Sequence, residues 1–356
     1  MTGNGLGLFL TGLPPALTID FAGRAEAAGW TTAWFPEITF GDSFGTATAA
    51  ALRTERIGIA TGVVGVWSRS PVTMALQAAT LHQLSGGRLV LGLGVQARGY
   101  VEGWHGRDYR KPVAAMRDFV TILRRIFAGD LTTYDGEIFS VRNFHLDMEL
   151  PDAPLKIYVA ANGPRMTELA GEIADGTVGW FQSLEYVRDV TMPALRHGAE
   201  QGGRSLDGFD VTVGFPAVVT RDDSGLEQAK GLVMMFATAL DSAPSYLESV
   251  RAAGFGDVAE AIGERVRAGD LRSAVALVPD EMTAAMVMAG SADRVRARIA
   301  AYREAGLSGV HLLPSPPGGY YPLYEGHFPV ESLSQLPAFD FPKLIASFSD
   351  AVELLA

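Results

Sequence analysis

The sequence predicts an α/β protein built as a (β/α)8 TIM barrel, a closed ring of eight parallel strands, with insertions. Short apolar runs alternate with longer helical patterns through most of the chain, which favours a parallel sheet. Eight such runs at these spacings fit a closed barrel better than an open doubly wound sheet. The chain has 356 residues, including 41 glycines, which suits one barrel domain with many tight turns between strands and helices.

The predicted strands are apolar runs that begin near the amino terminus and end near residue 313. The third of them is rich in β-branched residues, which favour extended backbone. The eight are expected at residues 6–10, 32–35, 57–64, 88–93, 156–160, 177–180, 211–219 and 310–313.

The predicted helices are marked by amphipathic patterns and by residues typical of helix ends. Ser70 and Pro71 suit an N-cap and a first helical position, and the helix that they begin runs to Leu84. Another helix begins at Pro164. The remaining clear helices are expected at residues 19–28, 112–127, 292–304 and 342–354.

Two segments are expected as insertions on the barrel. The sequence predicts a hairpin over residues 132–146, with its turn at Asp135 and Gly136, and several helices over residues 222–288. No linker rich in Pro, Ser and Gly surrounds the helical segment. Residues 1–356 are therefore predicted to form a single domain.

The composition excludes several classes of protein. The net charge is −11, from 40 acidic and 29 basic residues without a basic tract, so nucleic acid is not an expected partner. There is no cysteine, and the six histidines lack metal-ligand spacing, so neither disulfides nor a metal site is expected. No stretch resembles a signal peptide or reaches membrane-spanning length. A cytoplasmic enzyme acting on a small molecule is expected, without a membrane partner; a homodimer is left open.

Catalytic groups in such a barrel lie at the carboxyl ends of the strands, and the opposite end is mostly structural. This places Glu37 and residues 61–65, 92–96 and 160–163 on the catalytic face. Arg88 precedes the fourth strand, so it is interpreted as part of a structural turn. His105, beside Trp104 after the fourth strand, is the one histidine that is a catalytic candidate, whereas His82 is expected to be packed or solvated. The absence of a GxSxG motif argues against a serine hydrolase.

Residues 92–97, GLGVQA, match the GxGxxA pattern of dinucleotide-binding turns. We interpret the match as fortuitous because it follows the fourth strand, and because residues 98–106 are predicted to be a loop rather than a helix. The glycines still allow a flat ring or a phosphate to approach the backbone.

Eight short motifs occur in order between residues 5 and 313. They are Trp34-Phe-Pro-Glu37, Thr61-Gly-Val-Val-Gly-Val-Trp-Ser-Arg-Ser-Pro71, Leu84-Ser-Gly-Gly-Arg-Leu-Val-Leu-Gly-Leu-Gly94, Trp104-His-Gly106, Tyr158-Val-Ala-Ala-Asn-Gly-Pro164, Ala174-Asp-Gly176, Val278-Pro-Asp-Glu-Met282 and Tyr302-Arg-Glu-Ala-Gly306. With this set the chain resembles the luciferase-like oxidoreductases, and within them the deazaflavin-dependent branch that includes methylenetetrahydromethanopterin reductase.

The resemblance implies a tricyclic cofactor across the barrel mouth, with its phosphate tail toward the loops after strands four and five. A bulge at residues 62–64 would lie behind the ring, and we predict a cis peptide bond between Gly62 and Val63 there. The residues expected to bind the cofactor are Thr61, Gly62, Val63, Gly94, Val95, Gln96, Arg98, Ala161, Asn162 and Gly163.

Glu37 and His105 are the predicted catalytic residues, but the family's chemistry does not transfer in detail. Several members carry a histidine directly after the acidic residue at the end of strand two, and here Ile38 stands there. This puts in doubt any mechanism that uses that histidine as general base. Glu37 stands at the carboxyl end of strand two, so it is expected to face the cofactor or substrate, and no general-base role is assigned to it. Residues 96–98 also lack the carboxylate of the sugar-phosphate-oxidising relatives, so the substrate stays open.

The expected cofactor is coenzyme F420, used for hydride transfer. The alternatives are an FMN-dependent monooxygenase that uses reduced flavin and oxygen, and a flavin-binding protein without turnover. Basic residues are expected to help hold the anionic tail, namely Arg98, Arg107, Arg110, Lys111 and Arg165. Aromatic residues near the mouth indicate an apolar pocket, namely Trp67, Trp104, Trp180 and Phe181.

Overall fold

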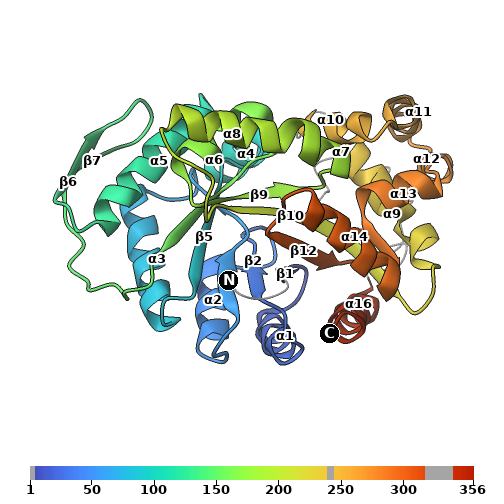
Figure 1. The fold of residues 1–356 in the computed structure, drawn as a ribbon, viewed down its shortest axis with the longest axis horizontal. Coiled ribbons are helices and arrows are strands. Elements are labelled where there is room, and N and C mark those ends of the chain that lie inside the picture. Colours follow the sequence, from blue (N-terminus) through green and yellow to red (C-terminus); the bar gives the residue numbers. More distant parts are fainter. Residues whose placement is uncertain (1–4, 239–243, 317–339) are drawn as a thin grey trace.

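The computed structural model describes residues 5–238, 244–316 and 340–356. Eight parallel strands form a closed barrel, which confirms the predicted fold class (Figure 1). In chain order they are β1 (Leu6–Phe9), β2 (Thr32–Phe35), β3 (Gly58–Thr61), β5 (Leu89–Gly94), β8 (Lys156–Ala160), β9 (Gly176–Trp180), β10 (Asp210–Thr220) and β12 (Gly309–Pro314). The ring closes where β10 pairs with both β9 and β12, and where β12 pairs with β1.

Helices surround the barrel and cover the apolar outer faces of its strands. They are α1 (Pro15–Ala27), α2 (Ser43–Ala51), α3 (Pro71–Leu84), α5 (Pro112–Phe127), α6 (Pro164–Ile173), α7 (Leu184–Tyr186) with the π-helical turn η1 (Val187–Thr191), α8 (Met192–Gln201), α14 (Ala292–Glu304) and α16 (Phe341–Leu354). The first and last helices lie side by side (Figure 1), since Phe21 packs against Phe348 and Arg24 donates to Ser349.

Local sequence explains the start of α3. The Ser70 side chain accepts a hydrogen bond from the backbone N–H of Thr73, and Pro71 occupies the first helical position, as predicted. The amphipathic α5 buries one face that includes Met116, Phe119 and Leu123.

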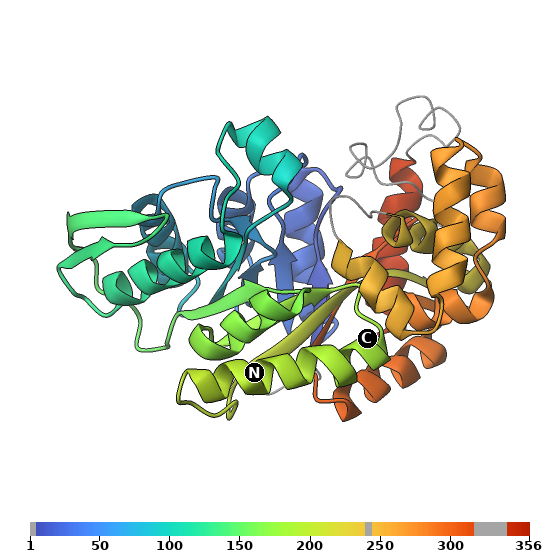
Figure 2. The ribbon, with the colours of Figure 1, turned by 90° about the horizontal axis from the view of Figure 1, so that it is seen from above.

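The two segments that the sequence predicted as insertions project from opposite ends of the molecule (Figure 1). One is the hairpin of β6 (Thr132–Asp135) and β7 (Ser140–Phe144), which Asp118 holds by accepting hydrogen bonds from the Tyr134 hydroxyl and from two backbone N–H groups. The other lies beside the barrel (Figure 2). It comprises α9 (Gly225–Ala237), α10 (Pro244–Ala252), α11 (Gly256–Arg267), α12 (Leu271–Ala276) and α13 (Asp280–Met286), followed by β11 (Met288–Ser291).

Most predicted strands agree with the structure to within one residue at each end, but the third does not. Strand β3 ends at Thr61, the peptide bond between Gly62 and Val63 is cis as predicted, and a short β4 (Val64–Gly65) then pairs with β5. The prediction of one continuous strand over residues 57–64 was wrong because the bulge interrupts the hydrogen-bonded ladder.

The structure also corrects three helix predictions. Helix α1 starts at Pro15, four residues before the predicted start, and α2 was not predicted because its small residues show no apolar period. Residues 98–106 were predicted to be a loop, yet Arg98–His105 forms α4. The GxGxxA turn therefore does lead into a helix, but its strand belongs to a closed barrel and not to a doubly wound sheet.

Among the described residues, no helix is long and apolar enough to cross a membrane.

Candidate active site

A cavity of about 360 Å³ opens at the carboxyl ends of the barrel strands. Its walls are mostly apolar and come from several strands and from the loops that follow them, which is where the sequence predicted the catalytic face. Apolar lining residues include Phe9, Val63, Val95, Ala160, Ala161, Val178 and Leu313. Polar groups enter from Thr11, Glu37, Gln96, Asn162, Tyr100 and Tyr246.

The bulge after β3 forms one wall of the cavity. Thr61 stands behind it, fully buried, and exchanges two hydrogen bonds of 2.8 Å with the backbone of Gly92. A Cβ atom at Gly62 would lie 2.6 Å from Phe9, and one at Gly94 would lie 2.5 Å from Val63. Only glycine fits at these two positions, so the backbone itself forms the surface there.

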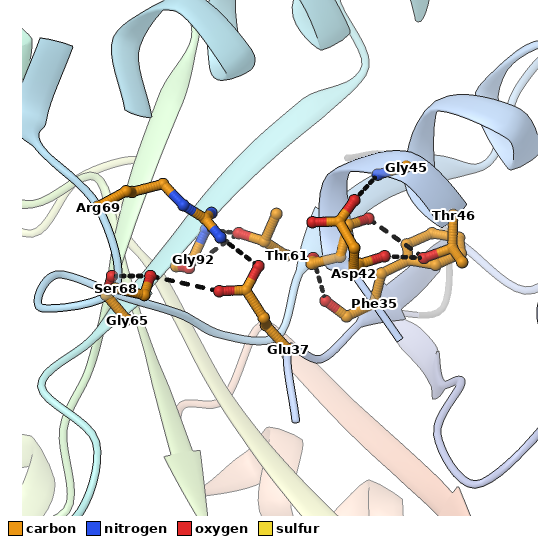
Figure 3. A network of polar contacts seen from close by, with 11 residues as sticks. Phe35, Glu37, Asp42, Gly45, Thr46, Thr61, Gly65, Ser68, Arg69 and Gly92 are labelled. Atoms are coloured by element: carbon orange, nitrogen blue, oxygen red, sulfur yellow. Dashed lines mark hydrogen bonds and ion pairs between the residues drawn. The ribbon is translucent and has the colours of Figure 1, made fainter. Parts of the chain in front are cut away.

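Glu37 reaches the cavity as a charge-balanced group (Figure 3). Its carboxylate accepts a hydrogen bond from Arg69 at 2.5 Å and one from the Ser68 hydroxyl at 3.3 Å. The side chains of Glu37 and Arg69 are only 16% and 14% exposed, and the guanidinium also lies over the Phe44 ring. A paired carboxylate of this kind is held in place and carries little net charge toward a ligand.

Asn162 is fixed by a network that follows β8 and β9. Its side-chain oxygen accepts hydrogen bonds from the Trp180 backbone N–H at 2.9 Å and from the Gln182 amide at 3.0 Å. The Tyr186 hydroxyl donates to the Asn162 carbonyl, and Thr191 donates to Gln182. Asn162 is therefore preorganised at the cavity wall.

The start of α6 lies next to Asn162. Gly163 is the N-cap residue, Pro164 follows at the first helical position, and no side chain caps the free N–H groups. A Cβ atom at Gly163 would meet nothing within 4 Å. The helix start therefore has open space above it and suits an anionic group.

The backbone around the mouth contains two residues in the left-handed region. Gln96 has φ of 57° and Phe181 has φ of 54°. The side-chain oxygen of Gln96 is buried and has no hydrogen-bond partner in the described part of the chain. Non-glycine residues in this conformation cost energy and gather at functional sites.

Most residues predicted to bind the cofactor line the cavity: Gly62, Val63, Gly94, Val95, Gln96, Ala161 and Asn162, together with Glu37. Thr61 supports the wall from behind, and Gly163 begins the adjacent helix. Neither His105 nor Arg98 lines the cavity. Arg98 is paired with Glu102 and lies over the Tyr109 ring, and His105 ends α4.

Charges predicted to attract an anionic tail are largely balanced by acidic neighbours. Arg110 is paired with Asp108 and Lys111 with Glu137, as Arg98 is with Glu102. Arg107 and Arg165 have no ion pair within the described residues. No group of three acidic or histidine side chains suited to a metal ion occurs in the described ranges.

Sequence reasoning missed two tyrosines of the cavity and the glutamine that holds Asn162. Tyr100 faces the cavity only because residues 98–105 are helical, and Tyr246 arrives from α10 in the helical segment. Burial raises the pKa of both phenols, so both are neutral hydrogen-bonding groups at physiological pH. Of the aromatic residues predicted near the mouth, Trp180 lines the cavity, whereas Trp67, Trp104 and Phe181 do not.

Comparison with known proteins gives a consistent set of similarities. The model of the luciferase-like monooxygenase family matches residues 3–309. The chain is 30% identical over 291 residues to 5,10-methylenetetrahydromethanopterin reductase of Archaeoglobus fulgidus, covering 80% of this chain and 86% of the relative. It is 28% identical over 320 residues to a putative coenzyme F420-dependent oxidoreductase of Mycobacterium tuberculosis, covering 83% and 90%.

Solved structures show the same fold at lower sequence identity. A coenzyme F420-dependent tetrahydromethanopterin reductase from Methanopyrus kandleri superposes with a TM-score of 0.79 at 22% identity, covering 99% of both chains. An oxygenating component of a diketocamphane monooxygenase from Pseudomonas putida, in complex with FMN, has a TM-score of 0.65 at 19% identity, covering 99% and 97%.

Proposed function

Since the chain belongs to the luciferase-like monooxygenase family, we propose that it is an oxidoreductase that transfers a hydride between coenzyme F420 and a small organic substrate. The observation that carries this proposal is the mouth cavity, where the backbone of Gly62 and Gly94 lines the wall and an uncapped helix start at Gly163 follows Asn162 of the same wall.

These residues fit a flat tricyclic cofactor with a phosphorylated side chain. Val63, Val95 and Ala161 offer apolar contacts for the two faces of a ring, and Asn162 offers an amide at the edge. The free N–H groups of α6 would hold the phosphate. The cofactor supplies the hydride-carrying carbon, and the chain's own residues bind, orient and shield it.

Glu37 is proposed as a fixed positioning group in the wall of the site. Its pairing with Arg69 and Ser68 occupies both carboxylate oxygens. A carboxylate in such a pair is held in one orientation and can position neighbouring groups.

Coenzyme F420 is favoured over FMN because the relatives at 28–30% identity are a putative coenzyme F420-dependent oxidoreductase and a methylenetetrahydromethanopterin reductase. FMN remains the specific alternative because a structure of the same fold holds it. An FMN-dependent monooxygenase would need reduced flavin and oxygen, whereas the deazaflavin carries out two-electron hydride transfer.

Titration of the purified protein with each oxidised cofactor tests the proposal. Fluorescence quenching at matched ionic strength should show micromolar or tighter binding of coenzyme F420 and weaker binding of FMN. Tight binding of FMN without binding of the deazaflavin overturns the proposal, and oxygen-dependent turnover with reduced FMN then establishes the alternative. Cofactor binding without turnover on a broad substrate panel would instead indicate a binding protein.

A further inference from the structure

The described residues that line the mouth cavity carry no unbalanced charge. Glu37 is the one carboxylate among the described residues that line it, and no lysine, arginine or histidine is among them. Arg69 neutralises Glu37 from behind, at 2.5 Å. A charged ligand placed in the cavity would therefore lose hydration without gaining an opposite charge, which is unfavourable.

Tyr246 provides a fixed polar group in this apolar surrounding. It comes from α10, and its ring packs edge-on against Phe181 and Phe236, with centroids 6.0 Å and 5.9 Å away. Trp180, which also lines the cavity, packs against the same Phe236 ring at 5.9 Å. The Tyr246 hydroxyl makes no hydrogen bond to another described residue. The ring is thus held by packing, and no hydrogen bond of the hydroxyl to the described residues helps to hold it.

A second phenol reaches the cavity from α4, the helix that follows β5. Tyr100 lies on α4, and its ring stacks on Trp104 with centroids 4.0 Å apart. Burial raises the pKa of Tyr100 and Tyr246, so neither phenol ionises near neutral pH. The loops and helices added to the barrel therefore contribute neutral hydroxyl groups, and the barrel strands contribute apolar surface.

We infer that the cavity takes an uncharged organic substrate with a carbonyl or hydroxyl oxygen, and that the Tyr246 hydroxyl donates a hydrogen bond to that oxygen. The inference rests on the proposed function in one respect, because it places the substrate beside a cofactor bound against the bulge. Tyr246 is then a residue that determines specificity.

Three probes of matched shape test the charge preference: cyclohexanone, cyclohexanecarboxylate and cyclohexylammonium. Their affinities are measured by calorimetry at neutral pH, on the protein with and without its bound cofactor. The ketone should bind at least about tenfold more tightly than either charged probe, because only the charged probes lose hydration without compensation.

The variant Tyr246→Phe tests the hydrogen bond. It removes one oxygen that makes no hydrogen bond to another described residue, so the variant should fold and melt like the wild type. Ketone affinity should fall about 5- to 10-fold, the effect of one lost hydrogen bond. Tyr134→Phe is the matched control, because Tyr134 lies in the hairpin, outside the cavity lining, and its hydroxyl donates to Asp118 of α5. It should lower thermal stability and leave ketone affinity unchanged.

The outcomes separate this inference from the proposed function. If either charged probe binds as tightly as the ketone, if the ketone does not bind, or if Tyr246→Phe leaves its affinity unchanged, the inference is overturned even where coenzyme F420 binds. If the deazaflavin does not bind but the charge preference and the Tyr246→Phe effect are found in the apoprotein, the proposed function fails and the inference stands.

Discussion

The two ends of the barrel use their polar groups differently. At the amino-terminal end, Arg88 donates five hydrogen bonds, to Thr54 and to backbone carbonyls that include those of Ala51 and Ile57. Glu26 accepts hydrogen bonds there from the backbone N–H groups of residues 55–57. Both charged groups are satisfied by the protein itself, as expected of a structural turn.

At the carboxyl-terminal end, some buried polar atoms have no hydrogen-bond partner among the described residues. Gln96 has a buried, unpaired side-chain oxygen, and Arg69 has an unpaired guanidinium nitrogen. The amino-terminal end also has a cavity, of about 660 Å³, and an unpaired Trp30 nitrogen, but its Lys156 is paired with Asp210. The charged groups of the amino-terminal end are thus hydrogen-bonded within the fold, whereas the carboxyl-terminal end leaves buried polar atoms that a ligand could contact.

Replacing Arg88 should have the largest effect and should act on folding alone. Arg88→Met removes five hydrogen bonds and leaves buried carbonyl groups without a donor, so the free energy of unfolding should fall by about 3 kcal/mol. Urea denaturation measures this loss, and titration of the folded variant should show unchanged cofactor affinity. A selective loss of cofactor affinity would contradict the assignment of the amino-terminal end to structure alone.

His311 is buried inside the barrel, against Phe9 and Trp34. Its titration reports whether water from the mouth reaches the barrel interior. Burial lowers its pKa to about 3, against an effect of Asp210 in the opposite direction. Because the folded pKa lies below the unfolded value of about 6.5, the unfolded chain takes up the proton first, and stability is lost as the pH falls below 6.5.

Between pH 7 and pH 5, the wild type should therefore lose about 2 kcal/mol more stability than His311→Gln. Urea denaturation of both proteins at the two pH values gives the difference, in which the other titrating groups cancel. Equal acid sensitivity of the two proteins would mean that His311 is hydrated from the mouth.

Gly163→Leu should separate binding from folding at the mouth. Its Cβ meets no atom within 4 Å and its φ is −83°, so the substitution should change the free energy of unfolding by less than about 0.5 kcal/mol. Cofactor affinity should fall at least about tenfold, or about 1.4 kcal/mol, because the side chain would fill the space above α6. Equal losses of affinity and stability would point to a purely structural turn.

Glu37→Gln should have the smallest effect, because the amide keeps a hydrogen-bond acceptor for Arg69 but loses the charge. We expect a loss of about 1 kcal/mol in cofactor or substrate affinity, with lower turnover. Glu172→Gln is the control, since it removes a carboxylate paired with Arg117 between α5 and α6, outside the cavity. Unchanged affinity and turnover for Glu37→Gln would make Glu37 a structural carboxylate.

Much of the architecture could be predicted from the sequence because its signals are local. The apolar runs of the barrel strands and the Ser70-Pro71 helix start are patterns within one or two turns of chain, and the structure confirms them. The ordered motifs predicted the family, which the match over residues 3–309 confirms. Local patterns failed where the backbone departs from them, as at the bulge after Thr61 and in the small-residue helix α2.

The barrel, its strand order and the end at which a site is expected follow from local patterns, because periodicity and the direction of parallel strands suffice for these. Which side chains meet depends on how distant elements pack. The pairing of Glu37 with Arg69, the support of Asn162 by Gln182, and the arrival of Tyr246 at the cavity each join separate elements. Closing the barrel and docking the inserted helices against it bring these residues within contact distance, and no local pattern carries that information.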